Sequence, residues 1–365
     1  MTYDLVVIGG GPGGCSAAIT AVRTGATVLL LERGTFPRNK VCGEFVSAES
    51  LELLHNLLAP AYQRLISEAP KIARGRIFSD GAELGAEINP PAASITRFDL
   101  DSALWRSCIL SGVEAREQCT AQTVEGTGPF RVTAGGEYFE TKALVNAAGR
   151  WSNLTGSQKV ARPRKEQWIG IKAHYMEPVT PASVDLYFFD GGYCGIQPVR
   201  FAQNGSAVRI NVCAMVRADV ATRLPEVLRC HPTLQERSRS WQPLMDTVST
   251  SPLVFHPPKP AQAGMLQVGD SATFVDPFIG DGISLALRSG ALAAECLARS
   301  FRNPGSQQDA LAEYSRLYKQ RLAGVFRASA KLRNLLRWPA AVRRPVLLLL
   351  ERTPFLTNQL VKMTR

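Results

Sequence analysis

The stretch YDLVVIGGGPGGCSAAITAVRTGATVLLLERG, residues 3–34 of a 365-residue chain, decides the fold. Its first run, YDLVVIG, predicts a buried strand because it is nearly continuous in apolar, partly β-branched residues. A glycine-rich turn follows, then an alanine-rich helix that we expect to end at Gly25, and then a second apolar strand in ATVLLLERG. Two such strands on either side of one helix indicate a parallel βαβ unit.

Gly9, Gly11 and Gly14 form a G-x-G-x-x-G motif between the predicted strand and helix. The first glycine permits a tight turn, the second lets the backbone approach a pyrophosphate, and the third lets the helix pack on the strand. The phosphates then lie at the helix N-terminus, where free N–H groups favour negative charge. Glu32 ends the second strand, where its carboxylate can accept hydrogen bonds from a ribose diol. The predicted dinucleotide site also includes Pro12, Gly13 and Arg33.

A second motif, VGDSATFVDPFIGDGISLAL, begins at Val268. Its Asp270 follows a predicted strand and could hold a sugar-like polyol. The segment Pro277–Ile283 places small residues at the start of a helix, and that N-terminus suits the electron-rich edge of a heterocycle. For Asp276 and Asp281 a second interpretation stays open, in which they cap helix N-termini.

Residues 163–256 have a different sequence pattern, in which apolar and polar residues alternate, as in WIGIKAHYM and GSAVRINVCAMV. This alternation is typical of antiparallel strands and predicts a sheet inserted into the nucleotide-binding part of the chain. We also predict helices over residues 47–58 and 96–112. The expected α/β organisation has a nucleotide-binding domain at 1–160 and 257–300, with parts of 60–100 on the substrate side, a β-sheet substrate domain at 161–256, and a basic helical segment at 301–365.

Composition excludes several classes of protein. The chain is 45% hydrophobic and 20% charged, which is an ordinary globular balance. No run approaches the ~18 apolar residues of a membrane span, and the start lacks the basic region of a signal peptide, so we expect a cytoplasmic protein. Eight scattered cysteines without a CxxC pair, and four histidines without helical pairing, predict reduced thiols and no metal site.

The net charge of +11 belongs to the C-terminal segment. Residues 299–365 hold fourteen Lys or Arg and three acidic residues, and the rest of the chain is neutral. A basic amphipathic helix is predicted to start near Ser306. Three interpretations stay open: a helix packed on the core with a solvated basic face, contact with an anionic membrane or lipid-like substrate, and docking of an acidic carrier protein. No recognition motif for nucleic acid accompanies the charge, so we expect no nucleic-acid partner.

Four motifs in a fixed order resemble a known superfamily. They are the glycine-rich βαβ unit with Glu32-Arg33, RFDLD (Arg97–Asp101), NAAGRWS (Asn146–Ser152) and the Gly-Asp pair at Gly269. Together they resemble the FAD-binding fold of the aromatic hydroxylases and geranylgeranyl reductases, whose other branch is the flavin-dependent halogenases. The resemblance covers roughly residues 1–300 and implies a Rossmann-like FAD-binding domain of the glutathione reductase type.

The resemblance also implies roles for individual residues. Glu32 would hold the adenosine ribose and Asp270 the ribitol, and Arg97 would approach the pyrophosphate or ribityl region. The backbone at Gly280–Ile283 would lie near the pyrimidine end of the isoalloxazine. The implied FAD-contact set further includes Lys40, Val41, Cys42, Ala121, Ala148, Gly149, Gly269, Pro277, Gly280, Gly282 and Ile283.

The loop FPRNKVCGEFVS, residues 36–47, is similar to the Lys-x-Cys-Gly segment of the geranylgeranyl-reductase-like branch. Two interpretations of Cys42 stay open. A buried cysteine can behave as a small hydrophobic residue. Alternatively the thiol packs against the flavin and takes part in the reaction, and Lys40 could lower its pKa.

The segment GGYCGIQPV, residues 191–199, matches an aromatic-rich segment of the same branch at Tyr193 and Pro198. Gly195 stands where that branch has a tryptophan, so the prenyl specificity of the branch does not transfer directly. Tyr193 is either a packed sheet aromatic or a proton donor, and it joins Cys42 as a candidate catalytic residue. His174, alone on a predicted strand, is expected to be structural.

Two departures narrow the expected reaction. Ala148-Gly149 replaces the Asp-Gly pair of aromatic hydroxylases, and the halogenase signature Trp-x-Trp-x-Ile-Pro is absent. We therefore predict an FAD-dependent oxidoreductase that reduces a C=C bond or related acceptor of a small hydrophobic substrate: prenyl-, lipid- or polyketide-like, or carrier-tethered. The alternative is a monooxygenase that hydroxylates or epoxidises an aromatic or polyketide substrate, with a halogenase or an electron-transfer protein less favoured. Without a second G-x-G-x-x-G motif, electrons would come from transiently bound NAD(P)H or a separate redox partner.

Overall fold

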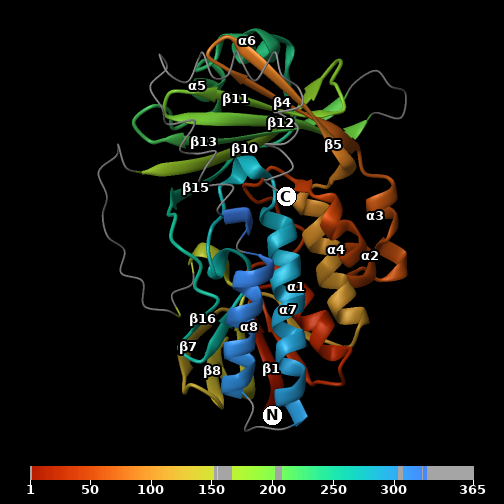
Figure 1. Cartoon of the computed structure of the whole chain (residues 1–365), viewed down its shortest axis with the longest axis vertical. Helices are drawn as coiled ribbons and strands as arrows, with labels where there is room; N and C mark the ends of the chain where they lie inside the picture. The colour runs from red at the N-terminus through yellow and green to blue at the C-terminus, as the bar shows by residue number, and fades with distance from the viewer. Residues whose placement is uncertain are drawn as a thin grey trace.

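The computed structural model describes residues 2–151, 154, 167–201, 208–302, 307–322 and 324–326. Two sheets divide these residues (Figure 1): one forms the upper part of the view under α5 and α6, and the other lies lower, beside the long helices α1, α7 and α8. Several short helices connect the longer elements. Their bounds are η2 Pro60–Tyr62, α3 Arg64–Ser67, η3 Gly149–Trp151, η6 Ser238–Ser240, η7 Gly269–Ser271 and η8 Pro277–Ile279.

The lower sheet contains the predicted βαβ unit. Its strand order is β16-β17-β9-β1-β2-β6, and β1 pairs in parallel with both β2 and β9, so the predicted parallel unit is confirmed. Strands β7 and β8 extend it beside β9. The bounds are β1 Thr2–Ile8, β2 Val28–Leu31, β6 Glu114–Arg116, β7 Ala121–Glu125, β8 Phe130–Ala134, β9 Glu137–Asn146, β16 Ala261–Gln262 and β17 Met265–Gln267.

Helices α1 (Pro12–Val22), α4 (Arg97–Leu110) and α7 (Gly282–Arg302) cover one face of this sheet over a shared apolar core. Helix α1 ends three residues before the predicted end, because Thr24 and Gly25 already bond as a turn and Gly25 has a φ of +88°. Helix α4 is confirmed as predicted, and the Thr96 hydroxyl accepts from the Asp99 N–H at 3.1 Å as its N-cap. The predicted helix at 47–58 is η1 Ala48–Ser50 followed by α2 Leu51–Leu57.

The upper sheet has the order β14-β10-β13-β12-β11-β4-β5-β3, with β15 beside β10. Its central pairs are antiparallel as predicted, but β11 pairs with β4 in parallel, because β4 and β5 come from residues 71–94 and join the sheet from a distant part of the chain. The bounds are β3 Phe45–Val46, β4 Lys71–Ser79, β5 Ala82–Ser94, β10 Trp168–Glu177, β11 Ser183–Phe189, β12 Gly192–Phe201, β13 Val208–Arg217, β14 Gln242–Pro243 and β15 Val248–Leu253.

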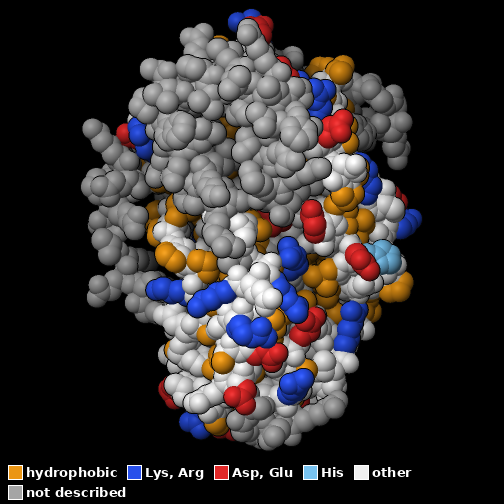
Figure 2. All heavy atoms as spheres, in the orientation of Figure 1, with side chains coloured by type: hydrophobic (Ala, Val, Ile, Leu, Met, Phe, Trp, Pro, Cys, Tyr) orange, Lys and Arg blue, Asp and Glu red, His pale blue; other side chains and the backbone are white. Residues whose placement is uncertain are grey.

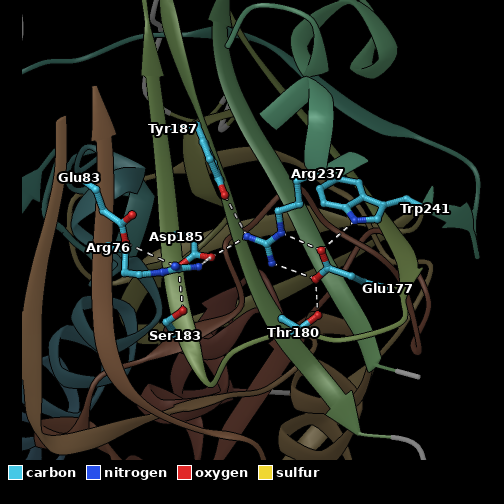
Figure 3. Close-up of polar contacts among 9 residues, drawn as sticks. All are labelled: Arg76, Glu83, Glu177, Thr180, Ser183, Asp185, Tyr187, Arg237 and Trp241. Carbon is cyan, nitrogen blue, oxygen red and sulfur yellow. Dashed lines mark hydrogen bonds and ion pairs between the residues drawn. The ribbon is translucent and has the colours of Figure 1, made fainter. Parts of the chain in front are cut away.

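The outer face of the upper sheet lies under α5 (Leu224–Leu228) and α6 (Pro232–Arg237) and carries a buried ion network (Figure 3). Arg237 donates twice to Glu177, at 2.7 and 2.9 Å, and once to Asp185, at 2.6 Å. Arg76 donates to both oxygens of Asp185. Two guanidinium groups therefore neutralise two carboxylates and fix the end of α6 on the sheet.

Helix α8 (Gln307–Arg321) confirms the predicted start of the C-terminal helix; residues 327–365 lie outside the described residues. Tyr314 on its buried face donates to the Gln267 carbonyl at 2.9 Å. Its exposed face carries Arg316, Lys319 and Arg321, and Figure 2 shows basic side chains interspersed with acidic ones where α7 and α8 lie. This part of the basic segment is packed on the core. No helix within the described ranges is long and apolar enough to cross a membrane.

Candidate functional site

The glycine motif forms the tight turn between β1 and α1. Gly9 has a φ of +108°, a left-handed backbone conformation that favours glycine. A Cβ atom at Gly14 would overlap the carbonyl oxygen of Gly9, so helix and turn pack too closely for any side chain. At Gly11 the nearest atom would be 4.0 Å away, at Arg97 Nη2. The backbone at Gly11 is therefore open to a close-approaching group, as the motif predicts.

Glu32 lies at the end of β2 and is 4% exposed. Its carboxylate accepts from the N–H groups of Gly10 (2.8 Å) and Gly34 (2.9 Å) and from Arg38 Nη1 (2.9 Å). Burial opposes ionisation, but Arg38 and the two N–H groups outweigh it, so the pKa of Glu32 is lowered. A carboxylate can accept about four hydrogen bonds, so this oriented anion keeps capacity for a ribose hydroxyl.

Arg97 lies at the start of α4 beside Gly11. Its Nε and Nη2 atoms donate to the two oxygens of Asp101, each at 2.7 Å. Although burial favours the neutral guanidine, the charge and hydrogen bonds of Asp101 hold the pKa of Arg97 above its usual value. The structure thus keeps a fixed positive charge next to the open backbone of Gly11, where a pyrophosphate would need one.

The loop of residues 36–47, which we call the Cys42 loop, lies between the glycine turn and the upper sheet. Asn211 of β13 donates from Nδ2 to the carbonyl oxygens of Cys42 (3.0 Å) and Gly43 (2.9 Å), and the Glu44 N–H donates to Cys42 Sγ at 3.3 Å. A Cβ at Gly43 would meet nothing within 4 Å. Burial, followed by repulsion from Arg97 and Arg38, lowers the pKa of nearby Lys40 to about 8.

A buried charged group beside this loop was not predicted from the sequence. Glu44 is fully buried; one carboxylate oxygen accepts from the Arg97 N–H at 2.8 Å and pairs with Lys172, and the other bonds His174 Nε2 at 2.8 Å. Burial raises the pKa of Glu44, but His174 and Lys172 outweigh it, so the pKa is lowered. The signal was present, because Lys172 and His174 alternate with apolar residues and therefore share one face of a strand. A lysine on such a face needs a charged partner.

An aromatic cluster covers the inner face of the upper sheet. Tyr193 is 5% exposed, and its ring centroid lies 5.4 Å from that of Phe188 and 5.8 Å from that of Phe278. Burial raises the pKa of Tyr193 well above its usual value, so the phenol keeps its proton at neutral pH. Tyr193 is thus packed among aromatic rings, and its protonated phenol leaves the proton-donor interpretation open. We name this group the inner-face cluster, and its members are Tyr193, Met215, Leu253 and Phe278 with the partly buried Trp168, Leu186, Phe188, Phe255 and Phe274.

The middle motif and the Gly-Asp motif lie together. The Gly149 N–H donates to Ser271 Oγ at 2.8 Å, and Arg150 Nε lies 3.6 Å from Asp270 Oδ2. The Arg150 guanidinium lies 4.4 Å above the ring of Phe274, and its Nη1 atom is buried without a hydrogen-bond partner in the described part of the chain. This places a partly buried cation between Asp270 and the inner-face cluster.

The start of α7 is tied to the end of the Cys42 loop. Ser47 Oγ donates to Asp281 Oδ1 at 2.9 Å and lies 2.6 Å from Ser284 Oγ. Burial raises the pKa of Asp281. Asp276 precedes η8 without a side-chain cap bond to it, so the capping interpretation is wrong for Asp276. Gly280 has a φ of +75° and packs against the ring of Phe45.

The structure brings most predicted site residues into one region between the two sheets, but not all. We call this region the strip; it runs from the glycine turn along the Cys42 loop to Gly149, Asp270 and the start of α7. Arg33 is exposed. Ala121 begins β7 and packs on the apolar cluster on the other face of the lower sheet, away from α1. Val41 packs against β10 at Gly170. The other predicted residues of this region are Pro12, Gly13, Ala148, Gly269, Pro277, Gly282 and Ile283, and they lie at the turn, at the end of β9, or at η7, η8 and the start of α7.

These residues fit the FAD that the resemblance implies. A Cβ at any of four motif glycines would meet nothing closer than 4.0 Å, so their backbones leave room along the strip: Gly11, Gly43, Gly149 and Gly282. Three buried polar atoms there lack a partner among the described residues and remain available to a ligand: Arg38 Nε, Arg150 Nη1 and Asn211 Oδ1. Cations for phosphates and a carboxylate for a ribose lie beside the glycine turn.

Comparison with known proteins agrees with this geometry. Residues 40–296 match a family model described as FAD dependent oxidoreductase, and residues 4–60 match a second model with the same description. A digeranylgeranylglycerophospholipid reductase of Methanocaldococcus jannaschii is 25% identical over 350 residues, covering 92% of this chain and 86% of the relative. A menaquinone reductase of Mycobacterium tuberculosis is 27% identical over 322 residues, covering 80% and 76%.

Solved structures share the fold. A geranylgeranyl bacteriochlorophyll reductase-like protein of Thermoplasma acidophilum superposes with a TM-score of 0.77 at 20% identity, covering 100% of this chain and 95% of that one. A flavin-dependent brominase superposes with a TM-score of 0.78 at 20% identity, covering 100% and 93%. The expected FAD-binding α/β fold, with reductases and halogenases as its neighbours, is confirmed.

Proposed function

This chain belongs to the family of FAD dependent oxidoreductases, and we propose that it reduces a C=C bond of a hydrophobic substrate by hydride transfer. Bound FAD supplies the redox chemistry, and the protein supplies binding, orientation and electrostatics. Glu32, Arg97 and Asp270 hold the cofactor in this proposal, and the Cys42–Gly43 segment borders it beneath the upper sheet.

The inner-face cluster is the observation that carries the proposal. It is built from aromatic and aliphatic side chains, several of them only partly buried, directly beside the Pro277–Ile279 turn. Apolar and aromatic linings of this kind suit a hydrophobic ligand. The names of the relatives that act on a digeranylgeranylglycerophospholipid and on menaquinone support an isoprenoid-type substrate.

Reduction of a C=C bond also requires a proton at the second carbon. Two groups of this chain are candidates, the Cys42 thiol and the Tyr193 phenol. The Tyr193 phenol carries its proton at neutral pH, but burial raises its pKa and makes it a weaker acid than a solvent-exposed phenol. NAD(P)H or a separate redox partner would supply the electrons. The basic segment 301–365 would contact a membrane surface or an acidic carrier that presents the substrate.

A second candidate is an oxygen-using enzyme. It is favoured by a relative named 1H-pyrrole-2-carbonyl-[peptidyl-carrier protein] brominase of Pseudoalteromonas luteoviolacea, which is 22% identical over 322 residues. In that case reduced enzyme would consume O₂ and oxygenate or halogenate an aromatic or polyketide-like substrate. The Ala148-Gly149 pair and the missing tryptophan signature weigh against it.

One experiment separates the two. The holoenzyme is reduced under anaerobic conditions and mixed with a geranylgeranylated glycerophospholipid or with menaquinone. Reductase activity predicts that the oxidised flavin spectrum returns and that the product gains two hydrogen atoms in its prenyl chain. Fragment masses locate these atoms, because reduction of a quinone ring to the quinol adds the same mass. If only O₂ reoxidises the enzyme and the product carries an added oxygen or halogen atom, the reductase proposal is wrong.

A further inference from the structure

We infer that Glu44, Lys172, His174 and Asn211 act together to fix the Cys42–Gly43 segment in the position it takes beside the cofactor. We call these four residues the Glu44 cluster and treat them as positioning residues. The inference rests on FAD binding and not on which substrate is reduced, so it goes beyond the proposed function.

The hydrogen bonds hold the segment from both its backbone and its side chains. Asn211 reaches two successive carbonyl oxygens, those of Cys42 and Gly43, with one amide group. Glu44 is bonded through both carboxylate oxygens to β10, by Lys172 and His174, and also to the first N–H of α4. Three elements far apart in the sequence thus converge on three consecutive loop residues.

The protonation of the cluster follows from these contacts. The lowered pKa of Glu44 makes it an ionised carboxylate, which only accepts hydrogen bonds. His174 must therefore carry a hydrogen atom on Nε2, and this N–H donates a hydrogen bond to the Glu44 carboxylate. The negative charge of Glu44 is balanced by Lys172, whose side chain is also fully buried.

Stability alone does not explain such a pair. Two charges removed from water carry a large desolvation cost, and well-packed apolar residues of similar volume are often as stable. Glu44 also has a φ of +61°, in the left-handed region that is unfavourable for a residue with a side chain. A charged cluster that holds a strained residue of the Cys42 loop is better explained by the position that it imposes on this loop.

The loop is also fixed at its far end. The Ile95 N–H donates to the Glu44 carbonyl at 2.9 Å, and Ser47 is tied to Asp281 at the start of α7. Between the glycine turn and these contacts, the Cys42–Gly43 segment depends on Asn211 and on the Glu44 side chain. Its position is therefore coupled to β10 and β13, the same strands that carry part of the inner-face cluster.

The test measures how readily Cys42 is exposed. The rate of Cys42 alkylation by iodoacetamide is followed by peptide mass in FAD-free and FAD-bound protein, together with the visible spectrum and reduction potential of the bound flavin. The variants are Asn211→Leu, which removes both amide donors, and His174→Leu, which removes the donor to Glu44. We expect roughly tenfold faster alkylation in both variants and a shifted flavin spectrum.

Two matched controls separate positioning from general stability. His174→Gln retains an N–H donor at a similar distance and should restore the wild-type alkylation rate. Arg237→Met breaks the ion network on the outer face of the same sheet, so it should lower thermal stability without changing the Cys42 rate.

Two results would overturn the inference. One is a wild-type Cys42 rate and flavin spectrum in Asn211→Leu and His174→Leu. The other is an equal rise in rate for Arg237→Met at the same loss of thermal stability. Because alkylation is measured without substrate, an enzyme that shows the expected Cys42 rates but reduces no C=C bond would contradict only the proposed function.

Discussion

Arg97 and Asp101 form a buried, two-bond ion pair across one turn of α4, and it holds the Arg97 guanidinium beside Gly11. The pair is neutral by itself, so its importance lies in where it places the cation. Without Asp101 the arginine would keep its charge but lose its fixed direction toward the glycine turn.

We therefore predict that Asp101→Asn weakens FAD binding by roughly ten- to hundredfold, the loss expected when a charge-assisted hydrogen bond no longer orients a phosphate-binding arginine. Titration of FAD-free protein, followed by the quenching of flavin fluorescence, measures the change. Arg76→Met, on the outer face of the upper sheet, serves as the control and should leave the affinity unchanged. An unaltered Kd in Asp101→Asn would show that Arg97 does not depend on this pair.

Gly11 and Gly14 differ in the space around them, and this difference leads to a second prediction. Gly11 has room for a methyl group in the protein itself, so Gly11→Ala should fold normally and lose FAD binding by about a hundredfold or more. Gly14→Ala should fail to fold or melt far lower, because its Cβ would overlap the Gly9 carbonyl. Thermal melting and FAD titration of both variants check this pair of outcomes. If Gly11→Ala binds FAD like the wild type, the pyrophosphate does not approach that backbone.

The sequence pattern correctly predicted those elements that form through contacts between residues close together in the chain. The β1–α1–β2 unit, the Gly9 turn, the position of Glu32 at a strand end and the helix that becomes α4 all follow from residues within one short segment. The end of α1 was predicted three residues too late, because Gly25 marks the end of the turn that follows the helix and not the end of the helix itself.

The Glu44 cluster could not be predicted in the same way. Glu44 and Lys172 are 128 residues apart, and their contact depends on β10 being placed over the Cys42 loop by the whole upper sheet. Periodicity indicated that Lys172 and His174 share a face, but it carries no information on what that face meets. The parallel pairing of β11 with β4 was not predicted for the same reason, because it joins two parts of the chain that are far apart in sequence.

Lys40 gives a prediction about pH. Its pKa is lowered to about 8, so it is charged below that pH and becomes neutral as the pH rises through it. Its neighbours Arg97 and Arg38 also lie along the strip, so loss of this charge should weaken the binding of an anionic dinucleotide. We expect FAD affinity to fall by up to about tenfold between pH 7 and pH 9 in the wild type. Lys40→Met should bind more weakly at pH 7 and show no such step, and a parallel pH profile in both proteins would assign the step to another group.

The outer ion network predicts how the fold responds to acid. Burial raises the pKa of Glu177, but Arg237 and the other donors around it outweigh that effect, so the pKa lies below the unfolded value of 4.5. A lowered carboxylate pKa contributes stability that is fully present above the unfolded pKa and is lost as the pH falls through the folded one. The stability advantage of the wild type over Glu177→Gln should therefore be constant near pH 7 and shrink below about pH 4.5.

Arg237→Met should be the more damaging change to this network, because it leaves Glu177 without its ionic partner and Asp185 with one cation fewer. We expect a loss of about 3–5 kcal/mol in the free energy of unfolding at pH 7, measured by urea denaturation. The loss should decrease as the pH is lowered and the two carboxylates take up protons. A double variant, Arg237→Met with Glu177→Gln, should recover part of the stability at pH 7, because it removes the buried charge of Glu177 that the single change leaves unpaired. If the double variant is no more stable than Arg237→Met, the damage comes from lost packing of the arginine side chain and not from the unpaired carboxylate.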